Sequence, residues 1–373
     1  MSHTYRVGVI GFAHMHVNNV AALFAQHSQV DMVACADTVP AVPELRAAPY
    51  TRGWNMKNAL NAIGIPKAYE DYREMLAKEA LDIAICTTEN ARHPEVVAAC
   101  AQANAHVCVE KPMAMSMSDA LQMARACEAA GVTMAVNWPI TWRPAARKAK
   151  ELIDQGVIGR VLEVRWRGGH RGPLGAGVSH AGVSGGAEAM NERELGATWW
   201  HRASDGGGAM LDFCSYGALV ARWYIGEPGV SAIGMRANLN SPWGDADDNG
   251  VMIVRFSRAM GVFEGTWTTR HQGVPNGPIV YGTKGTLVVG GGRGKPTVQV
   301  ETDESATYSC ERLPQGRRQI SEELIHHLDT GEPLHETLQV GMNLDATAIV
   351  DAGIRSADSG QLEPVNGPNW AIG

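Results

Sequence analysis

Strand-like and helix-like patterns alternate through the first 137 residues, and this alternation constrains the fold more than any other feature of the sequence. Short apolar runs typical of buried strands occupy residues 5–10, 30–36, 81–86, 107–109 and 132–136, with helix-like segments between them. Successive strand–helix–strand units form parallel pairs, so the pattern predicts a doubly wound α/β sheet with helices on both faces. A chain of 373 residues exceeds what one core organises, so we expect two domains, 1–137 and 138–373.

The strand at residues 107–109 ends in Glu110-Lys111-Pro112. Open α/β sheets bind ligands beyond the carboxyl ends of their strands, which is where Lys111 is expected to lie. An ammonium group there can donate a hydrogen bond or a proton to a substrate oxygen. Taken alone, the two charged residues are equally well explained as a solvated ion pair at a strand end.

The first strand runs directly into a glycine turn. A strand, a turn with Gly11, a helix, a second strand and the acidic residue Asp37 follow one another in the layout of a dinucleotide-binding domain. The fingerprint is degenerate, because Ala13 and His16 stand where the second and third glycines are expected. The turn residues that we expect beside the cofactor are Gly11, Phe12, Ala13, His14 and His16. Simple packing or surface positions remain the alternative for the two histidines.

Asp37 also predicts which dinucleotide binds. A carboxylate at the end of the second strand accepts hydrogen bonds from a ribose 2′-hydroxyl and repels a 2′-phosphate. No arginine follows Asp37 immediately in the sequence. We therefore expect NAD in preference to NADP.

A second motif lies at residues 205–216, where three glycines precede Asp212 and, four residues later, Tyr216. Four residues make about one helical turn, so the two side chains share a helix face and can reach one substrate. The alternative explanation is a buried aromatic ring beside a capped acid.

Together, the glycine turn, Glu110-Lys111-Pro112 and the Asp212 motif resemble the Gfo/Idh/MocA family of nicotinamide-dependent sugar oxidoreductases. The resemblance implies an α/β Rossmann domain followed by an α+β domain with a large, mainly antiparallel open sheet. It also implies that Lys111 is the active-site lysine and that the second domain forms a homo-oligomer. Further residues that it places near cofactor or substrate are Thr87, Asn90, His93, Glu110 and Arg143. For His93, a helix-start residue without chemistry is an equally good reading.

The chain departs from the family pattern at three positions. Glu89 replaces a proline, Cys214 a glycine and Tyr216 the usual histidine.

The activity that the resemblance implies is hydride transfer from a secondary hydroxyl of a sugar, polyol or glycoside to NAD. We expect Tyr216 to exchange the proton, Lys111 to lower the pKa of that phenol, and Asp212 to orient the hydroxyl. Lys111 itself as the base is left open.

Residues 168–200 are rich in glycine and lack periodicity, which is uncommon within a compact domain unless the segment is functional or disordered. We expect a lid that closes over a glycoside, with a surface flap as the alternative. Its candidate substrate contacts are His170, Arg171, His180 and Trp199, with Trp200 a weaker choice.

Beyond residue 228, runs of alternating apolar and polar residues predict the antiparallel sheet. Residues 245–250 resemble the start of a calcium loop, but Phe256 stands where the loop needs glutamate, so no metal is expected.

Composition excludes several other classes. The net charge is −7 without a Lys/Arg run, which argues against a nucleic-acid partner. No apolar run is long enough to span a membrane, and the seven cysteines form no CxxC pair, so we expect a cytoplasmic protein. Two alternative functions stay open: an NAD-dependent glycoside hydrolase of the same family, and a non-catalytic NAD-binding regulator.

Overall fold

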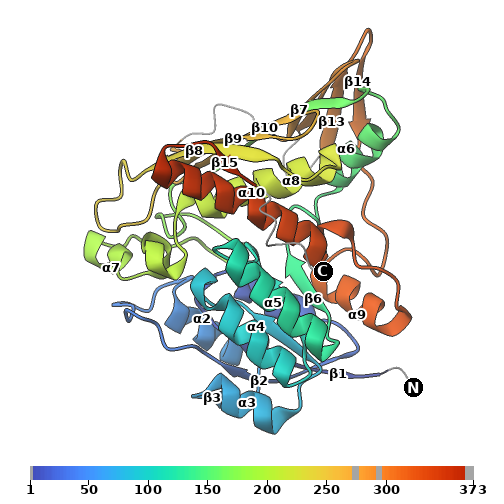
Figure 1. Cartoon of the computed structure of the whole chain (residues 1–373). Coiled ribbons are helices and arrows are strands. Elements are labelled where there is room, and N and C mark those ends of the chain that lie inside the picture. Colours follow the sequence, from blue (N-terminus) through green and yellow to red (C-terminus); the bar gives the residue numbers. More distant parts are fainter. Residues whose placement is uncertain (1–2, 271–276, 291–295, 366–373) are drawn as a thin grey trace.

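The computed structural model describes residues 3–270, 277–290 and 296–365, and contains two β-sheets (Figure 1). The first sheet has six strands in the order β3-β2-β1-β4-β5-β6, all parallel. Its strands are β1 (Tyr5–Ile10), β2 (Val30–Ala36), β3 (Ala68–Tyr69), β4 (Ile83–Cys86), β5 (His106–Glu110) and β6 (Met134–Asn137). This is the doubly wound sheet that the alternating sequence pattern predicts.

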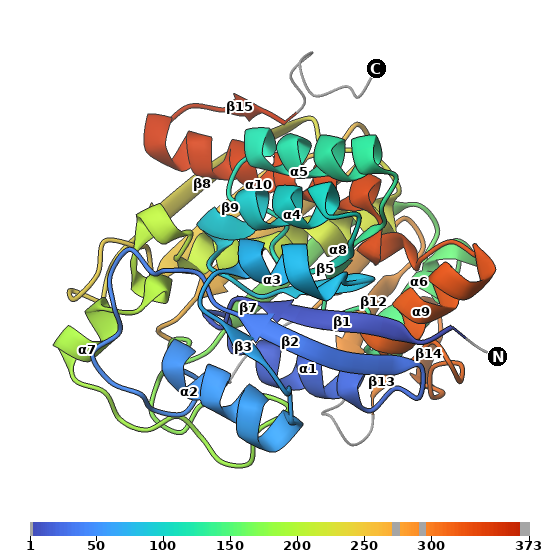
Figure 2. The same ribbon diagram turned by 90° about the horizontal axis from the view of Figure 1, so that it is seen from below.

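Helices connect these strands and cover both faces of the first sheet (Figure 2). They are α1 (Val17–Ala25), α2 (Arg52–Asn58) with the π-helical turn Ala59–Ile63, α3 (Tyr72–Glu79), α4 (His93–Gln102) and α5 (Met117–Ala130). Local sequence sets their ends: the Asp71 and Ser116 side chains accept hydrogen bonds from the first turns of α3 and α5.

The second sheet has nine strands in the order β14-β13-β12-β11-β7-β10-β9-β8-β15. Only β7 and β10 pair in parallel among the strands described; the other pairs are antiparallel. The strands are β7 (Val161–Gly169), β8 (Ser231–Ala237), β9 (Asn249–Arg255), β10 (Met260–Thr266), β11 (Ile279–Gly282), β12 (Thr286–Gly290), β13 (Thr297–Glu301), β14 (Ser305–Ser309) and β15 (Glu363–Pro364). The large, mainly antiparallel sheet is confirmed.

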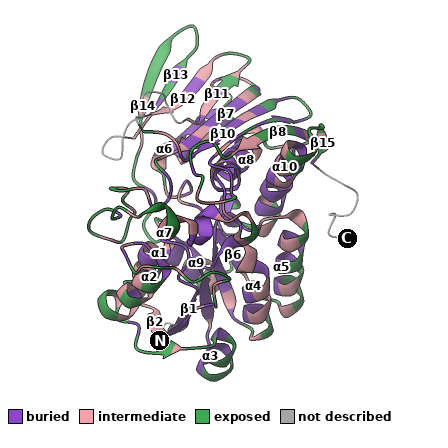
Figure 3. Ribbon diagram, turned by 90° about the vertical axis from the view of Figure 1, so that its left-hand side faces the viewer, coloured by how far each residue is buried: buried purple, intermediate pink, exposed green. Residues whose placement is uncertain are grey.

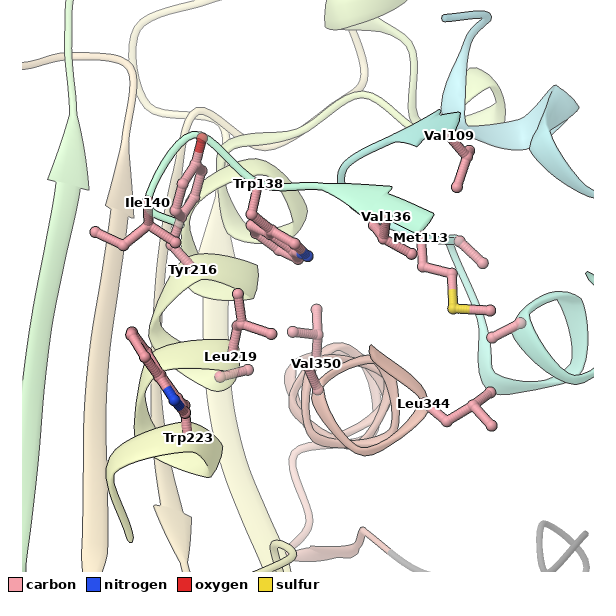
Figure 4. Packing of buried hydrophobic residues seen from close by; sticks show 14 of the residues in the cluster. Val109, Met113, Val136, Trp138, Ile140, Tyr216, Leu219, Trp223, Leu344 and Val350 are labelled. Atoms are coloured by element: carbon pink, nitrogen blue, oxygen red, sulfur yellow. The ribbon is translucent and has the colours of Figure 1, made fainter. Parts of the chain in front are cut away.

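One face of this sheet is covered and the other is open. The covering helices α8 (Ser215–Ile225) and α10 (Val340–Ser359) bury residues such as Val254 and Phe263. Figure 4 shows Leu219 of α8 and Val350 of α10 packed together, with Val136 of β6 and Trp138, just after β6, close by. Much of the opposite face is coloured exposed or intermediate in Figure 3.

Three further α-helices lie between the strands, and the first of them connects β6 of one sheet to β7 of the other. They are α6 (Pro144–Asp154), α7 (Glu192–Gly196) and α9 (Ile320–Thr330). Although α9 follows the second sheet in sequence, it packs on α1: Tyr5 Oη donates to Asp329 Oδ1 (2.8 Å) and Ser321 Oγ to the Leu23 carbonyl (2.9 Å). No helix in the described ranges is both long and apolar enough to cross a membrane.

Candidate active site

A cavity of about 740 Å³ lies where the carboxyl ends of β1 and β5 face the second sheet. Its walls come from both domains. Lys111, His14 and His16 line it from the first domain, and Asp212 and Tyr216 from the second. The structure thus brings together residues that are far apart in sequence, at the edge of the parallel sheet where ligands bind in open α/β folds.

Lys111 and Asp212 form a buried ion pair in this cavity. Lys111 Nζ lies 2.6 Å from Asp212 Oδ1, and Trp267 Nε1 donates to the other carboxylate oxygen at 3.3 Å. Burial alone would raise the pKa of Asp212, but the Lys111 ammonium outweighs it and holds that pKa below its usual value. The same pairing raises the pKa of Lys111 against the opposing effect of burial. Both groups are therefore charged at neutral pH.

Tyr216 lines the cavity in a setting that differs from our expectation. Its ring stacks on Trp166 (centroids 5.5 Å apart) and meets Trp138 edge-on (5.1 Å). Figure 4 shows the phenol oxygen pointing away from α10. Burial raises the pKa of Tyr216 to about 12, although Lys111 acts to lower it. Lys111 therefore acts on this pKa in the expected direction, but burial outweighs it, so the net lowering that we expected does not occur. The ammonium lies 5.1 Å from the ring centroid and pairs with Asp212.

The glycine turn is built for close backbone approach. Gly11 has φ +90°, and an added Cβ would lie 2.3 Å from Thr88 Cγ2 and 2.7 Å from its Cα. Thr87 fastens the turn: its hydroxyl donates to the Gly11 carbonyl (2.6 Å) and its carbonyl accepts from the His14 N–H (3.0 Å). Helix α1 begins directly behind this turn with no acidic side chain in its first turn. These residues fit a dinucleotide pyrophosphate, which favours the N-terminus of a helix.

Asp37 lies where an adenine ribose is expected, but an arginine reaches it. The Asp37 carboxylate accepts from the backbone N–H of Phe12 (3.0 Å) and from Arg52 Nη1 (2.5 Å). The second guanidinium nitrogen of Arg52 bonds to Glu89. Burial raises the pKa of Asp37 against the pull of Arg52. The expectation that no guanidinium adjoins Asp37 is therefore wrong, since α2 folds Arg52 back onto the end of β2.

His14, His16 and Glu110 form a compact group whose ligand atoms lie within 4.8 Å of one another. His16 Nδ1 is 2.9 Å from Glu110 Oε1, and Asn137 donates to the second oxygen of Glu110 at 3.2 Å. His14 Nδ1 accepts from the His16 backbone N–H (3.2 Å), so its ring proton resides on Nε2, an atom without a partner among the described residues. A protonated nitrogen cannot bind a cation, so the geometry suits a ligand oxygen better than a metal ion.

Asn90 and His93 hold structure together. Asn90 Nδ2 donates to the Gly206 carbonyl (2.8 Å), and His93 Nδ1 lies 3.1 Å from the Met113 carbonyl. Both are buried, and neither lines the cavity that contains Lys111. The buried Nε2 of His93 and Oδ1 of Asn90 have no hydrogen-bond partner among the described residues, so both readings of His93 remain open.

The glycine-rich segment lies across the first domain. The His180 N–H donates to Tyr50 Oη (3.2 Å), and that hydroxyl donates to the Gly185 carbonyl (2.8 Å). A Cβ on Gly182 would lie 2.6 Å from the backbone nitrogen of Asn19 in α1. The segment therefore covers the start of α1, beside the glycine turn. From it and the neighbouring strand end, the cavity is lined by His170, Arg171 and His180, while Arg143 lines it from the start of α6.

The two tryptophans exchange the positions that we expected. Trp199 is buried and its Nε1 donates to the Ala13 carbonyl at 2.9 Å, so it packs the domain junction. Trp200 lines the cavity and meets the ring of His14 edge-on at 4.8 Å. The sequence indicated that adjacent tryptophans lie near the substrate, but it did not show which of the two faces the cavity.

Sequence reasoning missed several residues of this region. Arg52, Glu89 and Trp267 form its ion-pair and hydrogen-bond network, and Arg167 and Arg270 line the cavity. Glu89 did carry a signal, as the replacement of a family proline. The others come from strand and helix ends whose meeting depends on tertiary structure.

Comparison with known proteins adds independent information. Residues 5–138 match the oxidoreductase family with an NAD-binding Rossmann fold, and residues 146–288 match the GFO/IDH/MocA C-terminal domain. Myo-inositol 2-dehydrogenase of Thermotoga maritima is 25% identical over 88% of this chain and 89% of its own length. 1,5-Anhydro-D-fructose reductase of Ensifer adhaerens is 27% identical over 60% of this chain, and that match spans only 62% of the relative.

Solved structures share the fold. The WlbA dehydrogenase from Bordetella pertussis, solved with NADH and UDP-GlcNAcA, superposes with a TM-score of 0.75 at 22% identity, covering 98% of this chain and 99% of that one. Levoglucosan dehydrogenase, solved with NADH and levoglucosan, gives a TM-score of 0.72 at 18% identity over 98% and 100% of the two chains.

Proposed function

Since the chain belongs to the Gfo/Idh/MocA oxidoreductase family, we propose that it is an NAD-dependent dehydrogenase oxidising a secondary hydroxyl of a sugar, polyol or glycoside. The observation that carries this proposal is the buried Lys111–Asp212 ion pair in the cavity between the two domains. Relatives named myo-inositol 2-dehydrogenase and levoglucosan dehydrogenase act on hydroxyls of this kind, which supports the substrate class.

In the proposed reaction, bound NAD supplies the hydride acceptor. Lys111 donates a hydrogen bond to the substrate oxygen, and Asp212 keeps the ammonium charged and oriented. Tyr216 is the candidate proton acceptor. Its raised pKa leaves only a small phenolate fraction at neutral pH, and only that fraction can take the hydroxyl proton. The hydrogen bond from Lys111 makes the substrate hydroxyl more acidic and so favours this transfer. Lys111 as the base itself stays the alternative.

The cofactor region favours NAD over NADP for a different reason from the one the sequence suggested. Arg52 is present, but Asp37 and Glu89 both bind its guanidinium, so the group carries one excess negative charge. A 2′-phosphate would meet that charge, whereas ribose hydroxyls would meet hydrogen-bond acceptors.

The Lys111→Ala substitution tests the proposal. We expect it to abolish most turnover with a panel of sugars, polyols and glycosides while leaving the Kd for NAD within about twofold, because the lysine acts on the substrate oxygen. The matched control is Lys148→Ala, which removes an exposed ion pair with Glu151 on α6. NADH formation by Lys111→Ala at the wild-type rate would contradict the role of this lysine.

The same assay separates the two rival functions. An NAD-dependent glycoside hydrolase would release the aglycone without net NADH, and a regulator would bind NAD without turning over any sugar. Lys111 and Asp212 both being present and paired favours a catalyst.

We also propose a homo-oligomer formed through the open face of the second sheet. Apolar side chains stand exposed on neighbouring strands of that face, including Ile233, Met235, Val251, Ile253 and Met260. An apolar area of this kind is typical of an interface. Sedimentation of an Ile253→Glu variant tests this: the wild type should be oligomeric and the variant should dissociate.

The proposed division at residues 137 and 138 separates cofactor binding from substrate binding. A cytoplasmic location is part of the proposal, supported by seven free cysteines, a state that persists in reducing compartments.

A further inference from the structure

The cavity is positively charged although the chain as a whole is not. Lys111 and four arginines line it, and Asp212 is the one carboxylate among its described lining residues. With neutral histidines, the lining carries an excess of four positive charges, in a chain whose net charge is −7. Burial lowers the pKa of the lining residues His14, His170 and His180, which keeps them neutral.

Two of these positive charges are already balanced. Lys111 pairs with Asp212, and Arg167 Nε lies 3.3 Å from Glu264 Oε2. The other three have neither an ion pair nor a side-chain hydrogen bond within the parts of the chain that the structure describes: Arg143, Arg171 and Arg270. All three are exposed to solvent, so water solvates them when no ligand is bound, and their positive charges make the cavity suited to an anionic ligand.

Arg171 and Arg270 follow the ends of the only parallel pair among the described strands of the second sheet. β7 and β10 end side by side. Beyond their ends, the His170 N–H donates to the Thr266 carbonyl (3.1 Å) and the Thr269 N–H donates to the His170 carbonyl (3.1 Å). These bonds extend the pairing, so Arg171 and Arg270 leave adjacent strand ends on the same side of the cavity.

The pyrophosphate of the cofactor does not account for these arginines. Its expected site is the Gly11 turn and the start of α1, in the first domain. Arg171 and Arg270 belong to the second domain, whose lining residues also include Asp212 and Tyr216. The two arginines therefore share the wall of Asp212 and Tyr216, although residues at the start of α1 line the same cavity.

Building on the dehydrogenase function proposed above, we propose that the substrate is an anionic sugar, whose carboxylate or phosphate binds Arg171 and Arg270 while a secondary hydroxyl meets Lys111. Guanidinium groups bind both anions in bidentate geometry. Arg143, at the start of α6, supplies a third positive charge to the same cavity.

Matched sugars test the charge requirement. Methyl β-D-glucuronide is compared with methyl β-D-glucoside, and glucose 6-phosphate with glucose, by steady-state NAD reduction and by calorimetric titration into the NAD-loaded enzyme. We expect at least one anionic member to bind at least tenfold more tightly than its neutral partner, with an affinity that falls as salt rises. The pair that shows the difference identifies carboxylate or phosphate as the bound group.

Arg171→Gln and Arg270→Gln then locate the site. Each variant should weaken binding of the anionic sugar by about 10- to 100-fold, the usual cost of losing a charged hydrogen bond, while changing the neutral sugar and the Kd for NAD less than about twofold. Arg193→Gln is the control, because Arg193 is an arginine of α7 that does not line this cavity. A matching loss of NAD affinity in either variant would assign the arginines to the cofactor and overturn the inference.

The outcomes for the two proposals are separable. Oxidation of neutral sugars with no preference for the anionic members leaves the dehydrogenase function standing and refutes the anionic substrate. Selective binding of an anionic sugar without NADH formation from any probe supports the anionic site and refutes the dehydrogenase. Failure of both anionic probes to bind below about 10 mM overturns the inference.

Discussion

Replacing Glu89 with glutamine should relax the preference for NAD. Glu89 is buried, and its carboxylate bonds to Arg52, whose other guanidinium nitrogen donates to Asp37. Glutamine keeps the size and one acceptor oxygen but removes the negative charge. Arg52 is then balanced by Asp37 alone, and its guanidinium becomes available to a 2′-phosphate.

Coulomb's law gives the size of the effect. At an effective dielectric constant of about 20 and a separation of about 8 Å, two unit charges interact with about 2 kcal/mol. A 2′-phosphate carries more than one negative charge, but solvent and salt screen it at the cavity edge. The loss of one carboxylate should therefore improve NADP relative to NAD by about 2 kcal/mol, or about 30-fold.

The assay is kcat/KM for NAD and NADP at one fixed sugar concentration and one ionic strength. The control is Glu44→Gln. Glu44 accepts the backbone N–H groups of Arg52 (2.8 Å) and Gly53 and does not bond to the guanidinium, and burial raises its pKa to about 7, so its charge is already partly lost at neutral pH. A ratio of NADP to NAD in Glu89→Gln that is unchanged, or no larger than in the control, would refute the electrostatic account of cofactor choice.

Three further predictions concern the cavity. Tyr216→Phe should lower kcat by about 10²- to 10⁴-fold if the phenol exchanges the proton; a near-normal rate with an unchanged pH profile moves that role to Lys111. Asp212→Asn should cost about 3–5 kcal/mol of unfolding free energy at pH 7, because it leaves a buried ammonium unpaired. Because the pKa of Asp212 is lowered in the folded protein, this stabilisation is present above pH about 4 and is lost as the pH falls further. In urea unfolding, the difference in unfolding free energy between wild type and variant should therefore be smaller at pH 3 than at pH 7. An equal difference at the two pH values contradicts the prediction. Shortening the segment between Gly175 and Gly186 should raise KM for glycosides far more than for a free sugar, and an equal effect on both would make the segment a surface flap.

The sequence by itself determined the elements of the fold and the nature of the site. Alternating apolar runs specify β1, β2, β4, β5 and β6 because strand and helix periods differ, and parallel order follows from the helices between them. The sequence predicted the tight turn at Gly11, and the structure gives the reason for glycine there, since only glycine tolerates the close approach of Thr88. Lys111 and Asp212 were predicted as site residues because they stand in the Glu110-Lys111-Pro112 and glycine–aspartate motifs that resemble the family pattern.

Only the tertiary structure decided which side chains meet. The strands β14 and β15 and the helix α7 escaped notice, because β15 has two residues and because β14 and α7 have no buried side chain and so no apolar pattern. Arg52 reaches Asp37 because α2 folds back on β2, and the spacing of the two residues in the sequence does not predict this contact. Likewise, burial between Trp138 and Trp166 sets the pKa of Tyr216, and burial depends on how the two sheets pack. The pairing of β7 with β10 places Arg171 beside Arg270, residues about a hundred positions apart in sequence, and so determines the charge of the cavity.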